Sequence, residues 1–223
     1  HYLKNVYFIT GTAYAGKSTT VKMLSEKYDM IFCGENYHSE VSNVVANPEN
    51  QPEISYLNNL TDFRDFVTRS PEEYARWIFA TSKEAAEFEI AELLSISKDK
   101  KVIVDTNIPI DILKEISDYN HVAVMISPLS MSVERFFDRN DPEKLFILNT
   151  IESCENPAEV MENYKKGLAL INSQENSRFS TEPPPNEEHA ENNTDEQITV
   201  NVLSVNVDIF NFENPSSYIP EGL

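Results

Sequence analysis

The chain has 223 residues, of which 40% are hydrophobic, enough for one α/β domain with a substantial core but crowded for two full domains. Lys and Arg total 18 against 37 Asp and Glu, so the formal net charge is −19. A surface of that sign repels nucleic acid and anionic membranes, and we expect neither as a partner. Two cysteines, no visible signal peptide and no apolar run long enough to span a bilayer favour a reducing compartment, and we expect the cytoplasm.

The first predicted elements are a strand over residues 6–10 and a helix over residues 17–28. The sequence that joins them fits the phosphate-loop pattern G-x-x-x-x-G-K-[ST], which arises by chance in roughly one chain of this size in a hundred. The alternative is an ordinary glycine-bearing turn, but the chain has only 5 glycines and two of them fill the required positions. We therefore predict a nucleotide-binding loop, formed by Gly11, Thr12, Ala13, Tyr14, Ala15, Gly16, Lys17, Ser18 and Thr19.

The residue types in this loop suit phosphate chemistry. Gly11 and Gly16 let backbone N–H groups approach phosphate oxygens without a Cβ in the way, and the following helix presents its unpaired N–H groups to the same anion. Lys17 supplies a mobile cation for the β- and γ-phosphates, and the Ser18 hydroxyl is a ligand for Mg²⁺. The predicted cofactors are thus ATP, or another nucleoside triphosphate, and Mg²⁺.

Apolar runs and helical spacing alternate along the rest of the chain. The polar stretch 39–69 is predicted to lie beside the sheet, with only short helical patterns, and residues 174–197 form an acidic loop. The remaining predicted elements are a buried strand at 30–33, a helix at 71–94 with N-cap Ser70, a strand at 101–105, a helix at 108–116, a strand at 122–126, helices at 131–139, 142–151 and 157–172, and a last strand within 198–212. This alternation predicts a single three-layer α/β domain over residues 1–223, with about five parallel strands and helices on both faces.

Polar side chains at the strand ends are the candidate catalytic and metal-binding groups, because ligands of open parallel sheets bind there. Asp105 follows three apolar residues, as expected of an aspartate that holds Mg²⁺, although a helix cap is the alternative. Glu35 follows the second strand and is a candidate base for a substrate hydroxyl, or else a solvated turn residue. Four further residues are candidates for binding the acceptor, with a surface or packing role as the alternative for each: His38, Arg64, Arg69 and Trp77.

Two arginines follow the fourth predicted strand. Arg135 and Arg139 stand at i and i+4, on one face of the predicted helix. Guanidinium groups at this place could close over the transferring phosphoryl and neutralise its charge. The alternative is a pair of exposed salt-bridging arginines, for which Glu134 and Asp138 are available partners.

Over residues 1–172 the layout resembles the small P-loop kinases related to nucleoside monophosphate kinases, shikimate kinase and gluconate kinase. Residues 34–38, Gly-Glu-Asn-Tyr-His, are similar to the Gly-Asp-x-x-His of gluconate kinases, with Glu35 replacing Asp. Residues 134–139 are similar to the Glu-Arg-x-x-x-Arg of the family's lid, which here would span residues 130–150. The resemblance implies that Glu35 orients the acceptor hydroxyl and that the lid arginines clamp the phosphates.

The chain also departs from that family. The stretch after His38 lacks the substrate pattern of gluconate kinase, and the acidic segment 174–197 is not a family feature. The sequence therefore predicts an ATP-dependent kinase of a small hydroxylated or phosphorylated acceptor, and leaves the acceptor open. Two alternatives stay open with it: a kinase of nucleotide sugars like the zeta-type toxins, and a non-catalytic nucleotide-binding sensor.

Overall fold

The computed structural model describes residues 3–96, 99–137, 141–179 and 201–204. Its centre is one sheet in the order β2-β3-β1-β4-β5, in which every neighbouring pair is parallel. The strands are β1 (Val6–Gly11), β2 (Ile31–Cys33), β3 (Val102–Asp105), β4 (Val122–Ile126) and β5 (Asn201–Ser204). The predicted α/β class with a parallel sheet flanked by helices is confirmed.

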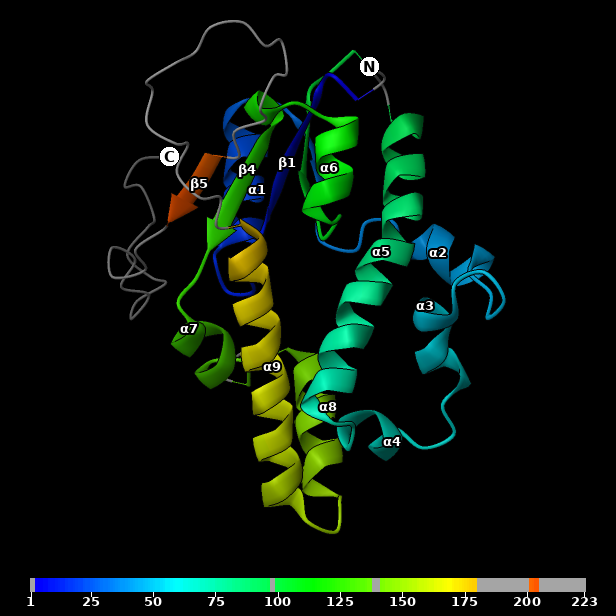
Figure 1. Cartoon of the computed structure of the whole chain (residues 1–223). Coiled ribbons are helices and arrows are strands. Elements are labelled where there is room, and N and C mark those ends of the chain that lie inside the picture. Colours follow the sequence, from blue (N-terminus) through cyan, green and yellow to red (C-terminus); the bar gives the residue numbers. More distant parts are fainter. Residues whose placement is uncertain (1–2, 97–98, 138–140, 180–200, 205–223) are drawn as a thin grey trace, which may run out of the picture.

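Helices cover both faces of the sheet, and the strand order explains their placement (Figure 1). The crossover from β1 to β2 runs toward one edge of the sheet, whereas the crossovers to β3, β4 and β5 run toward the other edge. Because such crossovers are right-handed, the first puts its helix on one face and the others put theirs on the opposite face. The helices are α1 (Lys17–Lys27) on the first face and α5 (Pro71–Ser95), α6 (Ile110–Ile116) and α9 (Pro157–Phe179) on the second.

Alternate side chains of β1 divide the core into two layers, as the period of a strand requires. Val6 and Phe8 pack with buried residues of α5 and α6 on one face. Tyr7 and Ile9 pack with Val21 of α1 on the other face. The sheet is thus apolar on both sides, which is characteristic of a parallel sheet between helical layers.

A second, aromatic core lies beyond the sheet, where α5 and α9 extend past it (Figure 1). The Tyr74 and Tyr164 hydroxyls of these two helices are 2.9 Å apart, and Phe66 and Trp77 pack beside them. This helical half contains α2 (Ser39–Val45), α3 (Pro52–Tyr56), the 3₁₀ helix η1 (Leu57–Asn59), α4 (Arg64–Val67), α7 (Leu129–Glu134) and α8 (Pro142–Glu152). A short 3₁₀ helix, η2 (Tyr119–His121), precedes β4.

Several predicted boundaries are confirmed by local chemistry. Ser70 caps α5 as predicted: its hydroxyl oxygen accepts from the Glu73 N–H at 3.2 Å, and the Glu73 carboxylate accepts from the Ser70 N–H at 3.0 Å. The stretch 39–69 lies outside the sheet, as expected, although more of it is helical than the sequence indicated.

Three predictions need correction. The strand predicted as buried at 30–33 is the edge strand β2, and Phe32 is 50% exposed because nothing pairs beyond it among the described residues. The helix predicted at 131–139 ends at Glu134, so Arg135 lies beyond its last residue. The helix predicted to end near residue 172 continues to Phe179, so the first six residues of the predicted acidic loop are helical. Residues 180–197 of that loop, Arg139, and residues 198–200 and 205–212 of the last predicted strand lie outside the described residues.

The end of β1 admits no side chain at Gly11. A Cβ there would lie 1.8 Å from the Met125 carbonyl oxygen of β4, and the φ angle of +130° is unfavourable for any other residue. Gly11→Ala must push two paired strands apart, and we expect it to lower the free energy of unfolding by about 3 kcal/mol. Urea unfolding followed by circular dichroism measures this change.

Gly34→Ala is the matched control for that substitution. The nearest atom to its added Cβ, at 3.1 Å, belongs to the ring of Phe32, a half-exposed side chain that can move aside. We expect a change below about 1 kcal/mol for this variant. Equal destabilisation by the two substitutions would contradict the steric explanation.

Candidate functional site

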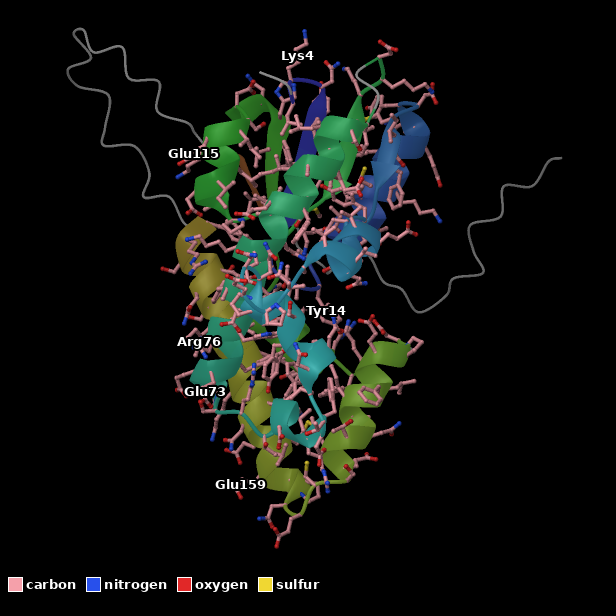
Figure 2. The ribbon with its side chains drawn as sticks, turned by 90° about the vertical axis from the view of Figure 1, so that its right-hand side faces the viewer. Lys4, Tyr14, Glu73, Arg76, Glu115 and Glu159 are labelled. Atoms are coloured by element: carbon pink, nitrogen blue, oxygen red, sulfur yellow. The ribbon has the colours of Figure 1, made fainter. Side chains whose placement is uncertain are left out.

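The loop of residues 11–18 turns sharply between β1 and α1. Three of its residues have positive φ angles: Gly11 at 130°, Tyr14 at 64° and Gly16 at 84°. Tyr14 is the one that carries a side chain into this unfavourable region, which costs on the order of 1 kcal/mol. Its hydroxyl donates to the Phe136 carbonyl at 2.8 Å, a contact that offsets this cost. In Figure 2, Tyr14 lies at the level where the sheet meets the helical half.

Hydrogen bonds to the end of β4 hold the loop in this shape. The Thr12 N–H donates to the Met125 carbonyl at 3.0 Å, and the Ser127 N–H donates to Thr12 Oγ1 at 2.7 Å. The Ser127 hydroxyl donates to the Ala13 carbonyl at 2.6 Å, so the 3.0 Å contact between the two hydroxyls has Thr12 as its donor. Each hydroxyl of this buried pair both donates and accepts a hydrogen bond, which makes the loop rigid.

Lys17 and the N-terminus of α1 give the loop its positive character. Lys17 is only 9% exposed, and its Nζ donates to the Thr12 carbonyl at 3.2 Å. The N-cap Gly16 has no side chain to accept from the first N–H groups of α1, and the first turn holds no acidic residue. Free N–H groups, the helix dipole and a shielded ammonium together form an anion site.

Ser18 joins this anion site to the end of β3. Its hydroxyl donates to Asp105 Oδ2 at 2.5 Å. Asp105 is 1% exposed, and its Oδ1 is buried without a hydrogen-bond partner in the described part of the structure. Burial raises the pKa of the Asp105 carboxyl, and the nearby Lys17 opposes that rise.

The donor set of Ser18 and Asp105 fits Mg²⁺. Both supply hard oxygen ligands, and the unused Oδ1 of Asp105 has no other role within the described residues. No group of three or more His, Cys, Asp or Glu residues with metal-binding spacing occurs in the part of the chain that the structure describes. Mg²⁺ does not need one, because it binds through one or two protein ligands together with phosphates and water.

A cavity of about 420 Å³ opens beside the loop. The cavity lies between the ends of β1 and β3. The chain leaves β1 toward one face of the sheet and leaves β3 toward the other face, and open α/β sheets bind ligands at such a position. Helices α5, α6 and α9 contribute the rest of its lining, together with Phe136 and Lys144 from the segment predicted as the lid. Glu35 also lines the cavity, and its Oε1 accepts from Asn107 Nδ2 at 3.3 Å.

The structure thus brings together the loop residues, Ser18, Asp105 and Glu35, but not the predicted lid arginine. Arg135 is exposed just beyond the end of α7 and does not line the cavity. Lys144 of α8 does line it, with its ammonium 5.2 Å from the Tyr14 ring centroid and 5.1 Å from that of Phe136.

The four predicted substrate-binding residues also lie outside the cavity lining. Arg64 forms a fork of hydrogen bonds to Asp62, and the guanidinium of Arg69 stacks 3.8 Å from the Tyr56 ring centroid. Trp77 packs in the aromatic core, and its Nε1 donates to the Glu53 carbonyl. His38 is buried, which lowers the pKa of its imidazole. Their contacts are those of packing and surface residues, the alternatives that the sequence left open.

Helix α9 supplies two cavity residues that sequence reasoning missed, Glu175 and Arg178. Glu175 is half-buried, and burial raises the pKa of its carboxyl to about 7 although Lys17 and Arg178 oppose the rise. The guanidinium of Arg178 lies 4.1 Å from the Phe79 ring centroid. The helical spacing of apolar residues continues from Leu168 and Ile171 to Phe179, a signal that the acidic composition of this stretch obscured.

The buried carboxyl of Glu89 was also missed. It lies on the inner face of α5, is 2% exposed, and accepts from Thr106 Oγ1 at 2.6 Å. Thr106 Oγ1 in turn accepts from the Ile108 N–H at 3.0 Å, so Glu89 anchors the turn that follows Asp105. Burial raises the pKa of Glu89 to about 7, and the charges of Asp105 and Glu35 add to this rise.

The raised pKa of Glu89 predicts a pH-dependent stability. Its pKa is about 7 in the folded state against about 4.5 in the unfolded chain, so folding favours the protonated form. The free energy of unfolding therefore falls as the pH rises from about 4.5 through 7. Glu89→Gln keeps an acceptor for Thr106 and removes the titration. From pH 5 to pH 8, its stability relative to the parent should rise by about 2 kcal/mol.

Urea unfolding of both proteins at the two pH values, with a chelator present, measures this difference. Glu175 titrates in the same range, so the comparison of variant with parent is what isolates Glu89. An identical pH dependence in both proteins would contradict the raised pKa of Glu89.

Comparison of the chain with protein-family models, curated proteins and solved structures gave no match in any of the three. No helix in the described ranges has the length and apolar character needed to cross a membrane. A functional assignment therefore depends on the loop, the end of β3 and the cavity between them.

Proposed function

We propose that the chain has a P-loop NTPase fold and is an ATP-dependent kinase of a small molecule. The observation that carries this proposal is the 11–18 loop: it combines the sequence pattern with positive φ angles at both required glycines and a hydrogen bond from Ser18 to a buried aspartate on the neighbouring strand. A turn that only joined a strand to a helix would need neither the shielded Lys17 nor the unpartnered Oδ1 of Asp105.

In this proposal the loop N–H groups and Lys17 bind the β- and γ-phosphates. Ser18 and Asp105 hold Mg²⁺, which neutralises charge on the phosphate oxygens when bound. Lys144 stands on the loop side of the cavity and adds a second cation there. Together these groups stabilise the negative charge that moves between the phosphates during transfer, the main requirement of phosphoryl transfer.

Glu35 is the proposed base for the acceptor. The hydroxyl oxygen of the acceptor forms a bond to the γ-phosphorus while the bond from that phosphorus to the bridging oxygen breaks and ADP leaves. The hydroxyl proton passes to the Glu35 carboxylate, which Asn107 holds at the cavity wall.

Acceptor-stimulated release of ADP tests the proposed activity. The protein is incubated with ATP, Mg²⁺ and a metabolite library, and ADP is measured. Stimulation by a hydroxylated compound supports a kinase. ATP binding without stimulation by any compound would instead favour the nucleotide-binding sensor.

Nucleotide binding should depend on Lys17. Lys17→Ala removes a charge-assisted contact in a shielded site, worth on the order of 2 kcal/mol, so the affinity for ATP-Mg²⁺ should fall by roughly tenfold or more. Calorimetry measures this affinity. Lys22→Ala, in an exposed position on the same helix, is the matched control and should bind like the parent. Unchanged affinity in Lys17→Ala would remove the basis of the phosphate-loop assignment.

If Asp105 holds Mg²⁺, the effect of its substitution on ATP affinity should differ between a solution with Mg²⁺ and one with a chelator. Asp105→Asn keeps the shape and an acceptor for Ser18 but loses the charge that binds the cation. We expect its ATP affinity to fall by about tenfold relative to the parent in Mg²⁺, and by much less in a chelator, where the parent has no cation to use. Equal losses under both conditions would show that Asp105 supports the loop without holding a metal.

A further inference from the structure

Beyond the phosphate loop, the cavity has a carboxyl group on each of two walls. Glu35 comes from the end of β2 and Glu175 from α9, and both line the cavity. Neither forms an ion pair in the part of the chain that the structure describes. Glu35 has a hydrogen bond from Asn107, whereas Glu175 accepts none from any described residue. A half-buried carboxylate without a donor favours a ligand that brings one.

Apart from Arg178, the cations that could bind a phosphate on the acceptor are used elsewhere. Arg64 is held by Asp62 and Arg69 by the ring of Tyr56, both away from the cavity. Lys17 and Lys144 lie at the phosphate loop, where the nucleotide needs them. An anionic acceptor would therefore meet two carboxylates with little to balance them.

Arg178 is the guanidinium that lines the cavity among the described residues, and it does not change this conclusion. Arg178 lies three residues after Glu175 on α9, and its guanidinium stacks on the Phe79 ring of α5. The charges of Lys17 and Arg178 oppose the rise in the pKa of Glu175 without cancelling it, and neither forms an ion pair with Glu175 among the described residues. Ile78, Ile171 and the ring of Phe79 give this wall an apolar surface, to which Thr81 and Ser82 add two hydroxyl groups.

We propose that the acceptor is a hydroxylated amine, an amino alcohol or amino sugar without phosphate or carboxylate, whose ammonium binds Glu175 and whose hydroxyl faces Glu35. This inference rests on the proposed kinase function and narrows it. The apolar side chains of Ile78, Phe79 and Ile171 accommodate the carbon skeleton of the acceptor. Glu175 binds the ammonium and takes no part in the phosphoryl transfer. A bound ammonium also keeps the Glu175 carboxyl ionised, against the burial that raises its pKa to about 7.

A panel matched for shape and varied in charge tests the acceptor class. Glucosamine, glucose and glucose 6-phosphate form one set, and 2-amino-1,3-propanediol, glycerol and glycerol 3-phosphate form another. ADP release with ATP-Mg²⁺ should be stimulated by an amine and at least tenfold less by its neutral and phosphorylated counterparts. Stimulation by a phosphorylated or neutral member equal to or above that by the amine would overturn the inference, and so would no stimulation by any member.

Substitution of Glu175 tests the proposed contact. Glu175→Gln should raise the KM for the productive amine by about tenfold or more, with a smaller change in kcat and no loss of ATP affinity, and Glu175→Asp should recover part of the KM. Glu159→Gln makes the same chemical change on the same helix at its far end, remote from Tyr14 in Figure 2, and should behave like the parent. An unchanged KM in Glu175→Gln, with the folded state verified by urea unfolding, would overturn the contact.

The two proposals fail in different ways. If the parent does not bind ATP-Mg²⁺, or binds it equally well after Lys17→Ala, the kinase assignment itself fails. If ATP binds in a Lys17-dependent way but the amines do not stimulate ADP release, only the acceptor inference fails.

Discussion

The approach of the β1 backbone to the Met125 carbonyl is the contact on which the rest of the site depends. Residue 11 must be glycine because the Met125 oxygen occupies the place of its Cβ. The approach puts the Thr12 N–H within hydrogen-bond distance of the same oxygen, and Thr12 Oγ1 against the backbone of Ser127. Beyond this fixed end, the loop turns through Tyr14 and Gly16, both of which have positive φ angles. A looser strand pair would leave the same residues without a defined anion site.

Electrostatics set the second constraint, since the chain has a net charge of −19. A triphosphate would approach such a surface against long-range repulsion, so the binding that we propose must come from short-range contacts with N–H groups and cations. Burial makes those contacts effective: Lys17 is shielded from water, where an ammonium interacts more strongly with an anion than at an exposed position.

The same burial acts in the opposite sense on the carboxyl groups behind the loop. Asp105, Glu89 and Glu35 influence one another around the end of β3, and burial raises the pKa of the first two. No described ion pair neutralises them. Hydrogen bonds from Ser18 and Thr106 stabilise two of them, and the unmatched negative charge that remains favours a divalent cation. This buried negative charge therefore suits the nucleotide and metal that we propose.

Much of the sheet and the loop could be predicted from sequence, because they depend on local patterns. Apolar runs mark β1, β3 and β4, and the glycine spacing marks the loop, since each feature lies within a few consecutive residues. Ser70 and Glu73 likewise mark the start of α5 through a contact between near neighbours. The loop and Asp105 could be placed beside one another for the same reason, since each stands at the end of an apolar run.

The cavity walls could not be predicted in this way, because they depend on which distant helices meet. Arg69 and Trp77 carry groups that suit a ligand, yet the aromatic core formed by α4, α5 and α9 holds them in packing contacts. Glu89 looks like one more charged residue of an acidic helix until the fold turns it toward Thr106. Sequence spacing gives the face of a helix on which a residue lies, but not the element that this face meets.

Helix α9 shows how composition can mislead. Its last turn is polar and precedes a run of acidic residues, so its sequence is typical of a loop. What keeps it helical is tertiary packing: Phe179 is buried against Val124 of β4, and this anchor draws Glu175 and Arg178 to the cavity. Helix α9 also packs against α7, so one helix joins the sheet, α7 and the wall that we assign to the acceptor. Composition describes each residue of such a helix separately, whereas its position is set by the three elements that it meets.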